Sequence, residues 1–301
     1  MTVKLALILG LLAAPAVSQE RAEPRHAVGA DITYSSDADD TEVVRAGVNL
    51  DLKYRDPDSY AGFRIERLRY SPSGGNRDHD TRVYLRLADR LGDWKYRTSV
   101  GTDGDTVVGS ASINNEAPLR QEYFIERDKI ETPIGVSRGL YYTFGGAAVD
   151  VPLGDTTQAT LLGGLQEFTG DNVRVHLRGN LIQVLKSEWG LSAQLRTRYF
   201  RNSDPNEYDY YSPRWYAEAL PVLQVRRFTG GWRLLAAGGL GAQRDSASGW
   251  RASRYLNLRA DRPALVAGWG ATGEIVYTST PITNSGDYHY VRANLGITRA
   301  F

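Results

Sequence analysis

Polar and apolar side chains alternate along most of this chain with a period of two. Over residues 173–185 the apolar positions are Val173, Val175, Leu177, Gly179, Leu181 and Leu185, and between them lie Arg174, His176, Arg178 and Asn180. Residues 290–301 repeat the pattern, with Val291, Ala293, Leu295, Ile297 and Phe301 on the apolar face. Beyond residue 25 we find no convincing run of apolar residues at helical spacing. The pattern therefore predicts β-strands that each have one apolar and one polar face.

Segments of this kind are about nine to fifteen residues long, are separated by Gly, Asp, Asn and Pro, and predict about sixteen strands. Their expected centres lie near residues 31, 48, 65, 85, 97, 109, 123, 143, 162, 179, 195, 218, 237, 255, 270 and 294. Short connections are expected at 55–58, 91–92, 114–118, 152–155, 187–190, 229–231 and 261–263, and longer ones at 71–80, 128–135, 202–209 and 278–286. Short turns that alternate with longer loops predict an all-β fold, a transmembrane antiparallel up-and-down β-barrel.

The amino-terminal residues 1–18 have the features of a secretory signal peptide. Lys4 supplies the charged start, residues 5–12 are apolar, and Ala16 and Ser18 are the small residues expected before a cleavage site. The apolar run is shorter than the ~20 residues that a membrane-spanning helix needs, which favours cleavage over an N-terminal anchor. We expect residues 19–301 to form the barrel, in a bacterial outer membrane.

Composition narrows the class of protein further. The chain has no Cys, which excludes disulfide scaffolds and thiolate metal sites. It has 36 basic and 35 acidic residues, and this near-neutral balance argues against a general nucleic-acid binder. Its mean hydropathy of -0.40 is too polar for a helical membrane protein. A secreted β-sandwich or propeller also uses many short strands, but strand length and loop alternation favour the membrane barrel.

A barrel of ~16 strands encloses a water-filled lumen. The alternation assigns these side chains to its lining: Arg174, Arg178, Gln194, Arg196, Arg198, Glu218, Arg251, Asn257, Arg259, Arg292 and Asn294. Two roles are open for the arginines, namely ion pairs with carboxylates of neighbouring strands or a track for sugar hydroxyls or carboxylate-bearing polymers. Aromatic residues near strand ends are expected mostly to form interfacial girdles; these are Tyr141, Tyr142, Tyr199, Phe200, Tyr208, Tyr210, Tyr211, Trp215, Trp250 and Trp269.

Two segments, 166–174 and 210–216, suggest a family. Their distinctive residues are Phe168, Asp171, Asn172 and Arg174 in the first, and Tyr210, Tyr211, Ser212 and Pro213 in the second. Both segments resemble the C-terminal porin-like domains of bacterial exopolysaccharide exporters, the outer-membrane subunits for cellulose and poly-N-acetylglucosamine and related tetratricopeptide-linked barrels. The resemblance covers residues 120–301 and implies a sixteen-stranded barrel that secretes polysaccharide. The terminal Phe301 resembles the signature that barrel insertion machinery reads.

The chain departs from that family at its amino end. The exporters carry a helical tetratricopeptide array before the barrel, whereas here the first expected strand follows the signal peptide closely. Secretion would then need a separate periplasmic tetratricopeptide scaffold, or the cargo is different.

The expected function is passage of a hydrophilic solute or polymer, with exopolysaccharide secretion favoured and no enzyme activity, cofactor or metal. One alternative is a hydrolase with a rim site around His79, which lies between Asp78 and Asp80 in an expected outer loop. A surface receptor or adhesion barrel is another. The acidic residues Asp37, Asp39, Asp40 and Glu42 lack the Gly spacing of a calcium loop, so a charged loop tip is the preferred interpretation.

Overall fold

Sixteen strands form one closed antiparallel barrel in the computed structural model, which describes residues 25–38, 40–73, 77–264, 268–281 and 288–301. The first eight strands are β1 (Arg25–Asp37), β2 (Glu42–Asp56), β3 (Ser59–Ser71), β4 (Asp78–Leu91), β5 (Trp94–Thr102), β6 (Val107–Asn115), β7 (Arg120–Lys129) and β8 (Tyr141–Pro152). The others are β9 (Thr157–Phe168), β10 (Val173–Lys186), β11 (Leu191–Asn202), β12 (Trp215–Thr229), β13 (Trp232–Asp245), β14 (Arg251–Arg262), β15 (Trp269–Thr278) and β16 (Tyr290–Ala300).

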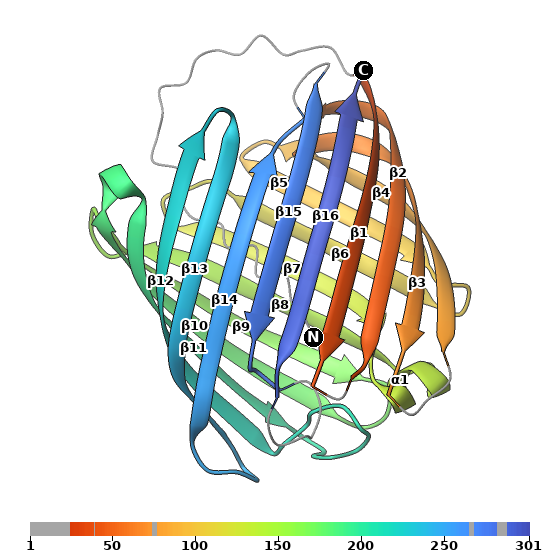
Figure 1. The fold of residues 1–301 in the computed structure, drawn as a ribbon, viewed down its shortest axis with the longest axis vertical. Helices are drawn as coiled ribbons and strands as arrows, with labels where there is room; N and C mark the ends of the chain where they lie inside the picture. The colour runs from red at the N-terminus through yellow and green to blue at the C-terminus, as the bar shows by residue number, and fades with distance from the viewer. Residues whose placement is uncertain (1–24, 39, 74–76, 265–267, 282–287) are drawn as a thin grey trace.

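Each strand pairs with its neighbours in sequence, and β1 pairs with β16 to close the ring. Figure 1 shows this closure, with the red first strand beside the blue last strand. Closure matters because an open edge would leave unpaired peptide groups in hydrocarbon, at several kcal/mol each. The predicted strand count is confirmed, and all sixteen predicted centres lie inside strands.

The barrel is apolar outside and polar inside. On β3, the side chains of Phe63 and Ile65 are 46% and 58% exposed, whereas Arg64 between them is half-buried and Glu66 after them is buried. On β10, Val175 and Leu177 are exposed while His176 between them is 1% exposed. A soluble protein would bury the apolar residues and expose the polar ones. The arrangement therefore fits an exterior covered by lipid and an interior that holds the polar groups.

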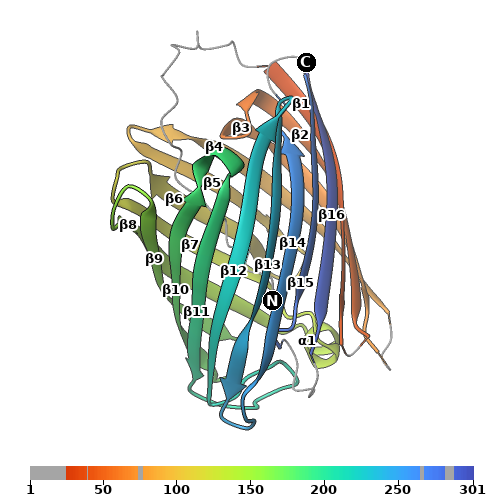
Figure 2. The ribbon, with the colours of Figure 1, turned by 60° about the vertical axis from the view of Figure 1, so that its left-hand side comes forward.

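The two ends of the barrel differ. We call the end with the two-residue turns, such as 57–58, 92–93 and 230–231, the turn end; the C-terminus lies there as well (Figure 1). Gly230 and Gly231 both have positive φ, 55° and 79°, which a side chain at either position would disfavour. The opposite end, which carries connections 130–140 and 203–214, is the loop end. Figure 2 shows α1 (Pro133–Arg138) and the β11–β12 connection together at the loop end.

Several predicted connections differ in length from the observed ones, and the loop expected at 202–209 spans 203–214. The turn expected at 261–263 is longer, because β14 ends at Arg262 and β15 begins at Trp269. Ala264 in this connection is buried, and its carbonyl accepts a 2.7 Å hydrogen bond from the hydroxyl of Tyr54 on β2. The loop expected at 128–135 instead spans 130–140 and contains the six-residue helix α1. Within the described residues no helix is long and apolar enough to cross a membrane.

Candidate functional site: the lumen and its loop end

Connection 130–140 leaves β7 and reaches the inner wall on the other side of the short β5–β6 hairpin. Val136 of α1 packs against Val43 of β2 and against Leu68 and Tyr70 of β3. These three partners belong to the inward-facing sets of their strands, and all are buried. The helix begins with Thr132 as its N-cap, whose hydroxyl accepts from the Gly135 amide. Connection 130–140 therefore lies on the inner wall at the loop end.

A network of charges fixes the root of this connection to β2 and β4. Asp128 of β7 accepts from Arg45 at 3.1 Å and from Arg82 at 2.8 Å. Arg45 also pairs with Glu131, and Arg82, whose side chain is 1% exposed, donates to the hydroxyl of Tyr70 at 2.9 Å. Arg45, Asp128 and Glu131 are partly exposed, whereas Arg82 is buried, so loss of Arg82 would remove a buried partner from Asp128.

Connection 203–214 folds over the β9–β10 turn, and the two family-like segments meet there. The guanidinium of Arg174 lies between the rings of Phe168 and Phe200, with ring-centre distances of 4.8 and 4.4 Å. It donates to the side-chain oxygen of Asn202 at 2.8 Å and to the carbonyl of Tyr211. Arg174 is inward-facing and only 4% exposed, and these contacts hold connection 203–214 in place.

Asn172 adds a second set of contacts between the same segments. Its side-chain amide donates to Asn202 at 3.2 Å and to the Tyr210 hydroxyl at 3.0 Å. The ring of Tyr210 stacks on Phe168 at 4.4 Å, and its hydroxyl donates to Glu207 at 3.0 Å. The remaining segment residues take part through the backbone: the Asp171 amide donates to Glu207, the Pro213 carbonyl accepts from Asn202, and the Ser212 carbonyl accepts from the Asn206 amide.

The girdle prediction is wrong for several aromatic residues because these contacts bury them. Tyr141, Phe200, Tyr210 and Tyr211 are each 7% exposed or less, and they pack within the loop end. Tyr142, Tyr208 and Trp215 are partly buried. Tyr199, Trp250 and Trp269 are exposed, as residues of a membrane interface would be.

Asp209 joins the two connections. Its carboxylate accepts from the Thr132 hydroxyl and from the Ile134 amide, both at 2.7 Å. We call connections 130–140 and 203–214 together the mouth loops. Through Asp209 their contacts form one continuous set from β2 and β3 to β9, β10 and β11, over the lumen side of the loop end.

The β5–β6 turn belongs to the same end of the barrel. Asp103 in this turn accepts from the Tyr141 hydroxyl at 2.6 Å and from the amides of Asp105 and Thr106. Burial acts to raise the pKa of Asp103, but these hydrogen bonds outweigh it and hold the pKa below its usual value. Lys129 at the end of β7 pairs with Asp80 of β4 at 2.9 Å, so contacts reach across this hairpin.

Most residues predicted to line the pore alternate with exposed apolar residues, and five of them are held by polar partners. Arg251 pairs with Asp245 at 2.7 Å, Arg292 with Glu274 at 3.0 Å, and Arg259 with Asp261 at 2.9 Å. Asn257 donates to Glu274 at 3.4 Å, and Asn294 donates to Thr33 at 2.8 Å. For these arginines the ion-pair role left open by the sequence is realised, and the acidic partners were not singled out beforehand.

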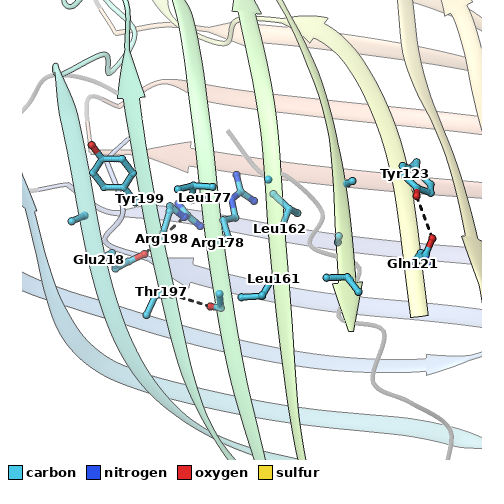
Figure 3. Close-up of a pocket in the computed structure, with 16 residues that line it drawn as sticks. Gln121, Tyr123, Leu161, Leu162, Leu177, Arg178, Thr197, Arg198, Tyr199 and Glu218 are labelled. Carbon is cyan, nitrogen blue, oxygen red and sulfur yellow. Dashed lines mark hydrogen bonds and ion pairs between the residues drawn. The ribbon is translucent and has the colours of Figure 1, made fainter. Parts of the chain in front are cut away.

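The other predicted lining residues gather on β10, β11 and β12. Arg178, Arg196 and Arg198 are half-buried, Gln194 is buried and accepts from Arg196 at 3.0 Å, and Glu218 lies 4.0 Å from Arg198. Figure 3 shows Arg178 and Arg198 next to each other, with Glu218 reaching toward Arg198. A cavity of about 890 Å³ borders this wall and includes Arg178, Arg198 and Glu218 in its lining.

Several residues of the site outside the predicted set also have a recognisable pattern in the sequence. Thr132 followed by Pro133 is a typical helix start and could have indicated α1. The alternation along β2, β3 and β4 puts Arg45, Arg64 and Arg82 on the polar faces, just as it does for the later strands. Asp209 had no such signal, because its partners lie about 75 residues away in sequence.

The hydrolase alternative loses its proposed site. His79 lies in β4, not in a loop, and its side chain is exposed while the next residue, Asp80, points to the lumen and pairs with Lys129. Successive strand residues face opposite sides of the sheet, so Asp80 cannot orient His79 as a base.

In the acidic cluster at the β1–β2 turn, the Asp37 carboxylate accepts a hydrogen bond from the backbone within the turn. Asp37 accepts from the Thr41 amide at 2.9 Å, and Asp39 lies outside the described residues. Among the residues that the structure describes, no group of three or more His, Asp or Glu is arranged to hold a metal.

The chain is similar to several solved bacterial structures. A bacterial polysaccharide outer membrane secretin aligns with a TM-score of 0.67 over 93% of this chain and 99% of its own, at 12% identity. OpdQ of Pseudomonas aeruginosa and a loop-deletion mutant of OmpT of Vibrio cholerae align over 92% of this chain and 99% of theirs, with TM-scores of 0.39 and 0.44 and identities of 11% and 10%. No family model and no curated protein matches the chain.

The chain has the fold of a porin-like outer-membrane barrel. Its closed ring of strands and its exposed apolar exterior suit that membrane, because no backbone edge meets the hydrocarbon and the exposed side chains are those that lipid solvates.

Proposed function

We propose that this protein is an outer-membrane pore for a hydrophilic solute or polymer, and that it secretes polysaccharide. The observation that carries the pore is the inward polar face of a closed sixteen-stranded ring. Rings of ~16 strands enclose more space than their own side chains fill. The mouth loops would restrict that space at the loop end, as inward-folded segments do in channels that select their cargo.

Two observations support polysaccharide as the cargo. The two segments that resemble exopolysaccharide exporters, 166–174 and 210–216, form one contact cluster around Arg174 and Asn172. The structure that aligns at TM-score 0.67 is itself described as a polysaccharide secretin. A pore with such cargo would need neither a catalytic residue nor a cofactor, because transport is movement without bond chemistry.

The proposal also includes two partners. Phe301 is exposed at the turn end and its backbone pairs with that of His26 at 2.9 Å, so the terminal ring is available to barrel insertion machinery. Removal of residues 1–18 as a signal peptide would precede that step. A separate tetratricopeptide protein in the periplasm would deliver the polymer to the turn end.

The surface receptor or adhesion alternative is less favoured. An adhesive barrel presents loops that extend away from the membrane. Connections 130–140 and 203–214 instead fold against the inner wall, where their apolar side chains are buried.

Conductance in planar bilayers tests the pore. We expect stepwise current increases on insertion, and we expect Arg196→Glu and Arg259→Glu each to shift the reversal potential toward cation preference, because each change reverses one charge in the lumen. Absence of channels would refute the pore, and unchanged selectivity in both variants would refute the assignment of these residues to its lining.

Release of labelled oligosaccharides from liposomes tests the cargo. Proteoliposomes that contain the protein should release oligosaccharides of several residues faster than empty liposomes do. Release of salt but of no oligosaccharide longer than a disaccharide would leave a general porin and refute polysaccharide secretion.

A further inference from the structure

On one side of the lumen, inward arginines form ion pairs with carboxylates. Five arginines on β2, β3, β4 and β7 each lie within 3.2 Å of a carboxylate: Arg45 with Asp128, Arg64 with Asp31, Arg82 with Asp128, Arg86 with Asp51, and Arg120 with Glu122. On this wall the arginines are part of the structure, because each has a fixed anionic partner.

The wall formed by β10 and β11 is built differently. Arg178 and Arg198 are direct cross-strand partners, and Arg196 stands opposite Asn180 in the same register. We call Arg178, Arg196 and Arg198 the arginine cluster. Like charges in direct register destabilise a sheet, so the arrangement needs compensation from an anion.

The described residues supply little of that compensation. Glu218 is 4.0 Å from Arg198, and its other carboxylate oxygen is occupied by the hydroxyls of Ser253 and Thr280. Glu126 of β7 faces Arg178 from beyond ion-pair distance. Neither Arg178 nor Arg196 forms an ion pair with any residue that the structure describes.

The guanidinium groups keep donors available. Arg196 lies over the Tyr255 ring at 4.6 Å and donates one hydrogen bond to Gln194, while its Nη2 has no partner. Arg178 lies over the Phe144 ring at 5.6 Å, and its Nε has no partner. Ring faces orient the planar groups without consuming their N–H donors. The two unpartnered atoms named above are buried, but the Nη groups of Arg178 and the guanidinium of Arg198 are less buried and donate no hydrogen bond to a described residue, which leaves these donors free to bind a ligand.

We propose that the arginine cluster is a binding site for carboxylate groups of the transported cargo. A guanidinium fork matches a carboxylate with two parallel hydrogen bonds, and two forks on neighbouring strands can hold successive carboxylates of one acidic sugar chain. The inference rests on the proposed function, because cargo must enter the lumen to meet these residues. It narrows the cargo to an acidic, uronate-type polysaccharide or a smaller carboxylate.

Calorimetric titration of the purified barrel in a sugar-free non-ionic detergent tests the site without relying on transport. The probes are hexagalacturonate, the galacturonate monomer and neutral maltohexaose, at low ionic strength. The test variant is Arg178→Gln with Arg198→Gln, which keeps a polar side chain, although a shorter one, and removes two charges. The matched control is Arg201→Gln with Arg254→Gln: Arg201 lies on β11 and Arg254 on β14, and both are exposed and point away from the lumen.

We expect hexagalacturonate to bind and maltohexaose not to bind. The test variant should bind hexagalacturonate at least ~tenfold more weakly, the control should match the unmodified protein, and added salt should weaken binding. Tighter binding of the hexamer than of the monomer supports a polymer, and equal binding supports small carboxylates at the same site. The proposal is overturned if neither acid binds, if maltohexaose binds equally, or if the test variant retains full affinity. Binding without conductance would refute the pore and leave this site standing.

Discussion

Asp209 is the carboxylate that ties the two mouth loops together, so its removal should loosen the loop end. In Asp209→Ala the hydroxyl of Thr132 and the amide of Ile134 lose their shared acceptor. Hydrogen bonds to a charged group contribute about 1.5–3 kcal/mol each. Asp209 is only half-buried and water can replace part of the loss, so we take about 3 kcal/mol for both contacts together.

This energy sets the size of the expected effect on the pore. A change of about 1.4 kcal/mol shifts an equilibrium tenfold, so separation of the loops should become about a hundred times more frequent. Ile130 and Leu140 of the first loop still pack in one cluster with Tyr210 of the second, which should keep the loops joined most of the time. We expect Asp209→Ala channels to alternate between the normal conductance and a larger one, on a timescale that single-channel recording resolves.

Asp204→Ala is the matched control for this experiment. Asp204 lies in the same connection, is exposed, and carries the same charge, but its carboxylate accepts no hydrogen bond from any described residue. It should leave the conductance pattern unchanged, and Asp209→Asn should restore part of the normal pattern because an amide oxygen can still accept. If Asp209→Ala and Asp204→Ala give the same recordings as the unmodified protein, the role assigned to Asp209 is wrong.

Three further changes probe the loop end and the terminus. Arg82→Ala should lower the free energy of unfolding by about 3 kcal/mol, because Asp128 loses a buried partner, and the shift of the heat-modified band on gels measures it. Gly170→Ala should weaken the contact with Glu207, because Gly170 has φ 114° and an added Cβ would lie 2.0 Å from the Glu207 carboxylate. Proteolysis of connection 203–214 should therefore become faster, and an unchanged rate would contradict this expectation. Deletion of Phe301 should reduce membrane insertion severalfold in an assembly assay, while normal insertion would remove its assigned role.

The strands could be predicted because their signal is local. Each strand lies between lipid on its outer side and the polar lumen on its inner side, so apolar and polar side chains alternate along it. The alternation is visible in a few consecutive residues such as Val175, His176 and Leu177. The same reasoning failed where the chain leaves the wall. Val136 is apolar although it lies in a loop, because its partners are inward residues of β2 and β3, and no local pattern identifies them.

The charged partners inside the lumen could not be predicted from the sequence for a related reason. Alternation shows that Arg82 and Arg198 are both inward, but it does not show what faces them. Arg82 meets Asp128 across a short hairpin, and Arg198 stands opposite Arg178 because of the β10–β11 register. A register shift of two residues would keep the same faces and exchange every partner.

The near-equal totals of 36 basic and 35 acidic residues therefore hide an uneven distribution. Carboxylates are concentrated opposite the arginines of β2, β3, β4 and β7, where they hold the wall and the mouth loops together. Fewer remain for β10 and β11, and the arginine cluster there keeps positive charge in partial contact with the lumen. A barrel that used arginine only for rigidity would gain by pairing both walls alike. On the wall of β10 and β11, Arg178 and Arg196 form no ion pair with a described residue, and a solute that passed through the lumen would meet them there.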